Sequence, residues 1–254
     1  MLPSSNRMNE LFVPAQTQVK ERYAVVNSSA LMPAFVSGWE KTACRVMISP
    51  ALGSPFCAVL ANLQPDGQCL GNTGADEYLI FVLEGQASVL LAEKRHRLEP
   101  GNYAYVPPSM DMQINSGVSG ARLVSISKRY NVAGKASRPV PVVAHEREVR
   151  AQAIPGAEGA TVKPLLPGDI DYDMALELIS FEPGASLANP LVRSTESGWF
   201  LWRGRGIARV DSDWHEVETG DAIRVAPYCS LALAGLGRQP TVCINWRATN
   251  RDPL

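Results

Sequence analysis

The sequence predicts an all-β protein made of two homologous domains in tandem. The first observation is that 19 prolines and 20 glycines are spread along the 254 residues. Between them lie short runs of apolar and β-branched residues, such as "EYLIFVL", "YAYVP", "MALELISF" and "TVCINW". Runs of this kind, bounded by turn residues, are typical of short strands joined by turns, and they leave room for only a few short helices.

The second observation is an internal repeat. Residues 77–108 align without a gap with residues 196–227, at a constant offset of 119 residues. Eight of the 32 positions are identical, whereas about two matches are expected by chance at ordinary composition. An offset this long indicates two homologous domains rather than a solenoid. The identical pairs are Glu77/Glu196, Phe81/Phe200, Gly85/Gly204, His96/His215, Glu99/Glu218, Gly101/Gly220, Val106/Val225 and Pro108/Pro227.

The repeat divides the chain into four parts. We expect an N-terminal arm (1–21), a first domain (22–130), a linker (131–168) and a second domain (169–254). The linker is rich in Pro, Gly and charged residues, and it has room for one short helix. Each domain is expected to be a small barrel or sandwich that buries alternate residues of its strands.

Composition excludes several classes of function. The formal net charge is −1 and no long basic block occurs, which disfavours nucleic acid and anionic membranes as partners. No apolar run reaches the length of a membrane span, and the N-terminus lacks a secretory signal. The cysteines are odd in number and form no C-x-x-C pair, which favours free thiols in the cytoplasm. They are Cys44, Cys57, Cys69, Cys229 and Cys243.

Several stretches resemble one family. The turn spacing, with "G-x5-P" in the second half of each repeat, resembles the cupin fold. The stretches "RYAVVNSSALMP", "SKRYNVAGKASRP", "LLPGDIDYDMALELISFEPGAS" and "NRDPL" resemble the bicupin (S)-ureidoglycine aminohydrolases, also called glyoxylate-induced proteins. The likeness runs from about Arg22 to the C-terminus. It implies a tandem double cupin, an all-β fold of two β-barrel or jelly-roll domains.

The resemblance also implies a function. In that family the second cupin binds Mn²⁺ and hydrolyses (S)-ureidoglycine to ureidoglycolate and ammonia, a late step of allantoin and purine breakdown. The first cupin carries no metal and supports assembly. If this chain is an enzyme, the resemblance makes it a hydrolase of C–N bonds. It also implies a homo-oligomer and a small ureide or anion as the ligand.

The metal-ligand positions of a cupin can be located by their spacing from the turn glycine and the strand-ending proline. In the second repeat Gly204 places the first three at Leu191, Arg193 and Ser197, and Pro227 places the fourth at Leu231. Residues two and four apart on a strand share a face, so these side chains should point into the barrel.

The residues at these positions are not metal ligands. The family carries Glu, His, His and Gln there, whereas two leucines cannot coordinate and a guanidinium repels a cation. We therefore expect no metal and no other cofactor in the second cupin. Glu196 should point away from the barrel interior if Ser197 points in. The first repeat has equally unsuitable residues at Asn72, Gly74, Tyr78 and Met112.

The same positions predict a candidate ligand pocket. Arg193 either binds an anionic ligand or pairs with a protein carboxylate, because a buried guanidinium without a partner is costly. Trp199, with Leu191 and Leu231, forms either an apolar wall of the pocket or a plug of the barrel. The family's substrate-facing tyrosine and lysine fall on Cys243 and Arg247, and Arg247 keeps a positive charge that can hold a carboxylate.

The histidines do not supply a metal site. His96 and His215 are expected as half-exposed strand residues, and His145 as a solvated linker residue. Three hypotheses for the function remain. The chain is an enzyme of the ureide pathway, a metal-free bicupin that binds a small anion as a sensor or as the partner of an enzyme, or a purely structural protein with both barrels filled by side chains.

Overall fold

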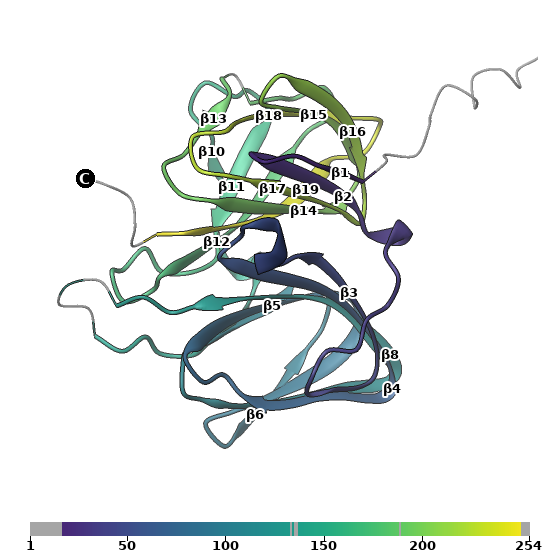
Figure 1. Ribbon diagram of the computed structural model, residues 1–254, viewed down its shortest axis with the longest axis vertical. Helices are drawn as coiled ribbons and strands as arrows, with labels where there is room; N and C mark the ends of the chain where they lie inside the picture. The colour runs from purple at the N-terminus through teal and green to yellow at the C-terminus, as the bar shows by residue number, and fades with distance from the viewer. Residues whose placement is uncertain (1–16, 133, 135–136, 188, 250–254) are drawn as a thin grey trace, which may run out of the picture.

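The computed structural model describes residues 17–132, 134, 137–187 and 189–249. Most of the expected N-terminal arm and the terminal "NRDPL" lie outside the described residues. Two packed β-domains follow one another along the chain, the first in the lower half of Figure 1 and the second in the upper half. The described helices are three short 3-10 turns, η1 (Ser28–Ala30), η2 (Pro50–Leu52) and η3 (Glu146–Glu148). The predicted all-β class is confirmed.

The first cupin is one sheet that folds over on itself. Its strand order is β3-β4-β8-β5-β7-β9, and β6 pairs with β5 outside this path. The longest strands carry bulges, for example between Leu63 and Gln68 of β4, and bulges let a strand bend round a barrel. The strands are β3 (Trp39–Ile48), β4 (Phe56–Asn72), β5 (Asp76–Leu91), β6 (Lys94–Leu98), β7 (Asn102–Val106), β8 (Asp111–Arg129) and β9 (Val142–His145).

The second cupin consists of two sheets. The larger one has the order β1-β2-β17-β14-β19-β12-β11-β10, and the smaller one has the order β13-β18-β15-β16. These strands are β1 (Gln18–Val19), β2 (Tyr23–Asn27), β10 (Gln152–Ala153), β11 (Ala160–Pro164), β12 (Met174–Phe181), β13 (Leu191–Val192), β14 (Ser197–Arg203), β15 (Arg205–Val210), β16 (Asp213–Glu218), β17 (Asp221–Val225), β18 (Ser230–Leu236) and β19 (Thr241–Ala248).

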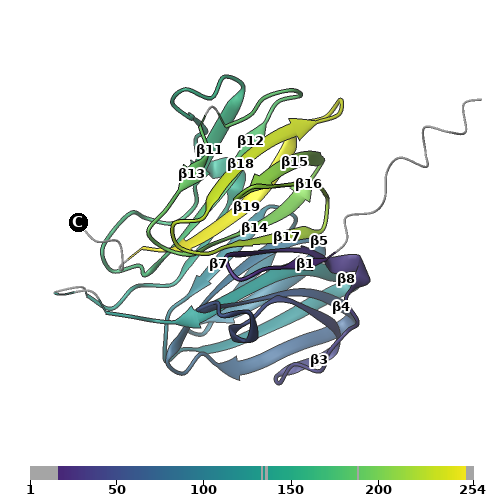
Figure 2. The same cartoon turned by 45° about the horizontal axis from the view of Figure 1, so that its top comes forward.

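Some strands at the domain edges belong to a sheet that their position in the chain does not predict. Strand β2 precedes the first cupin but pairs with β17 of the second, with Tyr23 opposite Val225. Figure 1 labels it among the strands of the second cupin, and Figure 2 shows its neighbour β1 on the same side of the molecule. The segment 131–168, expected as a linker, supplies β9 to the first sheet and β10 and β11 to the second. The two cupins are therefore joined by strand β2 as well as by the connecting chain.

Apolar side chains that alternate between the two faces of the strands form three apolar layers. One layer fills the first barrel and one fills the second, and a third lies between the two cupins. Phe200 and Trp246 contribute to the middle layer, whereas their neighbours Trp199 and Leu201 point into the second barrel. Each of these four side chains is buried. The strands β14 and β19 of the larger sheet are therefore apolar on both faces, as expected for strands buried on both sides.

Buried ion pairs also link the two cupins. The repeat-equivalent carboxylates Glu77 and Glu196 are both buried and both face the layer between the cupins. Glu77 lies 2.9 Å from the ammonium of Lys128, which also pairs with Asp173 of the second cupin. Glu196 lies 2.8 Å from Arg224. Its direction confirms that Glu196 points away from the second barrel.

Two histidine expectations are wrong. His145 is buried, because its ring packs over the turn glycine Gly101 (φ 94°), where an added Cβ would lie 2.7 Å from the ring. Its Nδ1 accepts a hydrogen bond from the backbone of η3. His215 is buried against Tyr23, whose hydroxyl lies 3.2 Å from Nε2. Only His96 is half-exposed as expected.

Candidate functional site

The four positions given by the cupin spacing meet at one end of the second barrel. Leu191 of β13 pairs directly with Leu231 of β18. Ser197 opens β14, and Arg193 lies in the loop between β13 and β14. Together with Trp199 they line one small cavity. The spacing therefore locates the right place in the fold, and we call this end of the barrel the mouth of the second cupin.

The cavity at the mouth is almost filled. Its volume is about 10 Å³, which is room for about one water molecule. Trp199 and Leu231 are each 1% exposed, and the indole nitrogen of Trp199 donates a hydrogen bond to the hydroxyl of Ser197 at 3.3 Å. Cys229 and Val225, which sequence reasoning did not select, complete the wall. A ligand would therefore rest at the mouth rather than deep in the barrel.

A carboxylate that sequence reasoning missed lies at the mouth. Glu177 of β12 is 3.6 Å from a guanidinium nitrogen of Arg193, and its other oxygen is 3.7 Å from Arg247 of β19. The three side chains are between 18% and 26% exposed. Both separations exceed the usual range for a hydrogen bond. Glu177 is therefore shared by two guanidinium groups and makes no bidentate hydrogen bond with either of them.

Three buried polar atoms near the mouth lack a hydrogen-bond partner. They are Nε of Arg247, Oδ1 of Asn245 and Oγ1 of Thr195. Asn245 lies opposite both Trp199 and Glu177 in the sheet, so it shares the face of the barrel interior. An unpaired buried polar atom costs about 1–3 kcal/mol. These atoms are available to a water molecule or to the polar groups of a ligand.

Comparison with known proteins places the chain in a family. It is 30% identical over 238 residues to a probable (S)-ureidoglycine aminohydrolase of Oryza sativa subsp. japonica, covering 92% of this chain and 75% of that one. The chain belongs to the ureidoglycine aminohydrolase family. It is also 29% identical to the (S)-ureidoglycine aminohydrolase of Arabidopsis thaliana, over 92% and 78% of the two chains. No protein-family model matches the sequence.

Solved structures show the same fold. Protein Ylba of E. coli superposes with a TM-score of 0.86 at 23% identity, over 98% of this chain and all of that one. Oxalate decarboxylase OxdC of Bacillus subtilis superposes with a TM-score of 0.71 at 12% identity, over 100% and 84% of the two chains. The predicted tandem double cupin is confirmed.

The mouth of this family member does not fit a divalent cation. A hard cation such as Mn²⁺ takes carboxylate, amide and imidazole ligands. The cavity offers instead the hydroxyls of Ser197 and Thr195, the guanidinium of Arg193 and apolar side chains. The nearby carboxylate of Glu177 already lies between Arg193 and Arg247, and two guanidinium groups repel a cation. Across the residues that the structure describes, no three His, Cys, Asp or Glu side chains gather to hold a metal. That the protein works without the metal stays a prediction.

The seven candidate pocket residues do not all reach the mouth. Arg193, Leu191, Ser197, Trp199 and Leu231 line the cavity, and Arg247 joins them through Glu177. Cys243 pairs with Leu201, deeper in the barrel, and is fully buried. Burial raises the pKa of its thiol to about 12, so the sulfur stays protonated and unreactive at neutral pH.

Glu177 had a recognisable signal in the sequence. In "MALELISF" it is the one charged residue of an otherwise apolar strand, and a charge in such a strand usually has a partner. The pairing of β12 with β19 supplies that partner, because it sets Ala175 beside Arg247 and Glu177 beside Asn245. Sequence alone did not give this strand order.

Within the residues described, no helix is long and apolar enough to cross a membrane.

Proposed function

We propose that this family member acts in ureide metabolism by binding a small ureide carboxylate at the mouth of the second cupin. Its relatives are named for action on (S)-ureidoglycine, and their names suggest the ligand class. The observation that carries the proposal is the shared carboxylate Glu177, held between Arg193 and Arg247. The guanidinium groups of Arg193 and Arg247 would thus occupy the position at which the family resemblance places a Mn²⁺ ion.

The charges at the mouth suit a carboxylate ligand. A guanidinium binds a carboxylate best as a bidentate fork, and neither Arg193 nor Arg247 makes such a fork with Glu177 at 3.6 and 3.7 Å. The Nε of Arg247 is buried without a hydrogen-bond partner. A ligand carboxylate would satisfy it and would share the two cations with Glu177.

The neighbouring amide suits the ureide part of the ligand. Asn245 is fully buried, and its Oδ1 lacks a donor. It lies two residues before Arg247 on β19, on the same face of the sheet. A urea N–H that donated to Oδ1 would remove the cost of this unpaired acceptor. Asn245 would thus bind the urea group and Arg247 the carboxylate of one ligand, from neighbouring positions on one face of β19.

A binding measurement tests the proposal. The probe is N-carbamoylglycine, which carries one urea group and one carboxylate, titrated calorimetrically and in thermal unfolding. At 100 times the Kd, binding stabilises the folded state by about 2.7 kcal/mol. Arg193→Ala should remove the effect, whereas Arg209→Ala, on an outward and exposed position of β15, should leave it unchanged. If the Arg193 variant binds as tightly as the wild type, the proposal fails.

Hydrolysis is a second candidate, and the family membership favours it. Ammonia release from ureidoglycine would show whether the chain turns this substrate over. The same preparation is analysed for Mn, Zn, Fe and Ni. Turnover that survives chelation would add catalysis to the binding site described above. Turnover that needs one metal ion per chain would contradict our assignment of the mouth.

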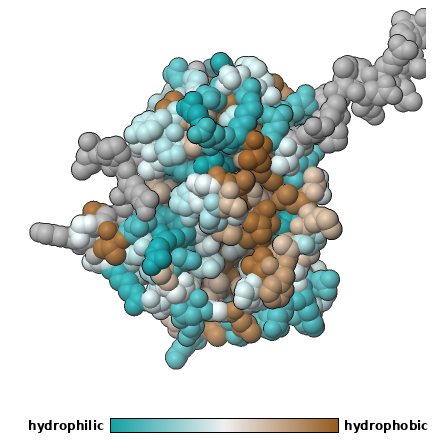
Figure 3. Space-filling model, in the orientation of Figure 1, coloured by the Kyte–Doolittle hydropathy of each residue, from teal (hydrophilic) through white to brown (hydrophobic). Residues whose placement is uncertain are grey.

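We also infer that copies of the chain associate and that they work in the cytoplasm. Figure 3 shows apolar side chains gathered in a stripe on one face of the molecule, and among the described residues Met32 and Phe35 are 86% and 90% exposed. Large exposed apolar patches commonly mark interfaces. Light scattering should give a mass above 27.5 kDa, and a monomer at micromolar concentration would refute association.

A further inference from the structure

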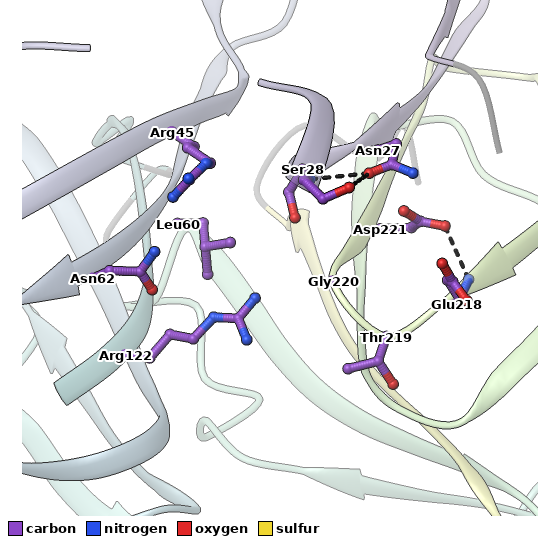
Figure 4. A pocket seen from close by; sticks show the side chains of 11 residues that line it. Asn27, Ser28, Arg45, Leu60, Asn62, Arg122, Glu218, Thr219, Gly220 and Asp221 are labelled. Carbon is purple, nitrogen blue, oxygen red and sulfur yellow. Dashed lines mark hydrogen bonds between the residues drawn. The ribbon is translucent and has the colours of Figure 1, made fainter. Parts of the chain in front are cut away.

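A second polar cavity lies between the two cupins, away from the mouth. Its volume is about 300 Å³, the lower end of the range for small-molecule sites. Figure 4 shows two walls. Arg45, Leu60, Asn62 and Arg122 of the first cupin form one wall, and the loop around Gly220 with η1 forms the other. Neither wall includes a residue of the mouth.

The first wall continues the apolar layer between the cupins. Arg45 pairs with Leu60 across β3 and β4, and Asn62 pairs with Arg122 across β4 and β8. Because side chains alternate along a strand, all of these residues lie on the same face of the sheet as Leu60, which belongs to that apolar layer. This face of the sheet is therefore apolar at its centre, and near its edge it carries the guanidinium groups of Arg45 and Arg122 with the amide of Asn62.

The guanidinium groups have donors to spare. Arg45 donates from Nε to the carbonyl of Leu31 at 3.0 Å, and no carboxylate of the described residues lies within ion-pair distance of it. Arg122 pairs at 3.3 Å with Glu84, whose side chain is 67% exposed. The Nε of Arg122 is buried without a hydrogen-bond partner. Such a buried donor is costly unless something accepts from it.

The second wall lies close to the first, and Gly220 and Ser28 contribute small side groups to it. A Cβ placed on Gly220 (φ 98°) would lie 3.3 Å from the hydroxyl of Ser28 and 3.7 Å from Arg122. A larger residue at 220 would therefore narrow the cavity. Asp221 accepts a hydrogen bond from the backbone of Glu218 at 2.9 Å. The carboxylates of Asp221 and Glu218 both line this wall, and they oppose the binding of an anion close to them.

We propose that this cavity binds a small dicarboxylate between the two cupins. Arg45 and Arg122 lie on strands separated by β4 and are offset by two residues along it, which sets their backbones about 12 Å apart. Figure 4 shows Leu60 and Asn62 between them. One carboxylate would take each guanidinium fork, and a short methylene chain would lie over Leu60. Asn62 would donate to either carboxylate. Fixed, well-separated cations select two linked anionic groups over one.

Calorimetric titration of the full chain tests this site with succinate and glutarate as probes, and with acetate and inorganic phosphate for comparison. We expect succinate or glutarate to bind at least 10-fold more tightly than acetate or phosphate. Arg45→Ala and Arg122→Ala should each weaken binding at least 10-fold. Asp221→Asn, which removes an opposing charge, should tighten it several-fold. Equal binding of acetate, phosphate and the dicarboxylates would overturn the proposal.

Matched variants separate this site from other causes. Arg95→Ala changes an exposed arginine of the first cupin that donates to Ser88, and it should leave the affinity unchanged. Arg193→Ala at the mouth should also leave it unchanged. If Arg122→Ala unfolds the protein, Arg122→Lys and Arg45→Lys keep the charge and should still weaken binding because they lose the fork. Unchanged binding in both lysine variants, or no binding of either dicarboxylate, would refute the site.

Discussion

Glu177 lies 3.6 Å from the guanidinium of Arg193, although Glu177 belongs to β12 and Arg193 to the loop that joins β13 to β14. Its second oxygen lies 3.7 Å from Arg247. One carboxylate therefore serves two cations at the end of the barrel where a cupin of this family is expected to hold a metal. Because two guanidinium groups share one carboxylate, the mouth carries a net charge of about +1.

Glu177→Gln should strengthen the binding of a small carboxylate. The substitution keeps the shape of the side chain but removes the anion that competes for Arg193 and Arg247. We expect the affinity for N-carbamoylglycine to rise about 10-fold, equivalent to about 1.4 kcal/mol. Glu182→Gln, at an exposed turn position, is the control and should change nothing. Weaker binding in Glu177→Gln would show that Glu177 itself contacts the ligand's cationic or N–H groups.

Asp221 should make folding stability depend on pH. Burial raises the pKa of its carboxyl group from 3.8 to about 6. Between about pH 4 and pH 6 the folded protein therefore holds a proton that the unfolded chain releases, so stability falls as pH rises and then levels off. Asp221→Asn should remove this loss and stabilise the protein at pH 7 by up to about 3 kcal/mol.

The first cupin shows that asparagine suits this position. Its repeat equivalent Asn102 accepts a hydrogen bond from the backbone of Glu99 at 2.8 Å, as Asp221 does from Glu218 at 2.9 Å. Urea unfolding at pH 4.5, 6 and 7.5 measures the effect. Asp66→Asn, at an exposed position in the bulge of β4, should leave the pH dependence as in the wild type. An Asp221→Asn variant with an unchanged pH profile would contradict the prediction.

Lys128 should be the most costly charge to remove. Its side chain is 2% exposed and pairs with Glu77 of its own cupin and Asp173 of the other, both at 0%. Lys128→Ala would leave two buried carboxylates without a cation, at a cost of about 3–5 kcal/mol. Chemical denaturation should show this loss. Arg147→Ala, which breaks a surface pair with Glu99, should cost at most about 1 kcal/mol; equal effects of the two variants would be the contrary result.

Gly198 should tolerate no side chain. A Cβ there would lie 2.2 Å from the ring of Trp246, its cross-strand neighbour in the layer between the cupins. We expect Gly198→Ala to destabilise the protein by about 3 kcal/mol, since overpacking a close core forces neighbours to move. Gly71→Ala has open space around it and should stay within about 0.5 kcal/mol. Thermal unfolding compares the two variants.

Much of the fold could be predicted from the sequence because the signals were local or repeated. Alternating apolar runs gave the strands, and the offset of 119 residues between Gly85 and Gly204 gave the two cupins. The sheet membership of Tyr23 and the burial of His145 did not follow. Both depend on edge strands that pair across the chain, and the pattern within a strand does not reveal its neighbour.

The candidate site could likewise be predicted only in part. The spacing from Gly204 and Pro227 correctly placed Leu191, Arg193 and Ser197 at one cavity, because strand geometry fixes which side chains share a face. The sequence left open whether Arg193 meets a ligand or a carboxylate. Glu177 was missed because its position opposite β19 is a matter of strand order. The second cavity, at Arg45, requires the packing of one cupin on the other.

We propose that the mouth binds a carboxylate through Arg193 and Arg247 rather than through a metal ion. The decisive experiment is titration of N-carbamoylglycine before and after removal of metals. We expect the Kd to change less than about two-fold after EDTA dialysis or after addition of Mn²⁺, and the affinity to fall at least about 10-fold in Arg193→Ala. Binding that disappears with EDTA and returns with one equivalent of Mn²⁺ per chain would contradict it.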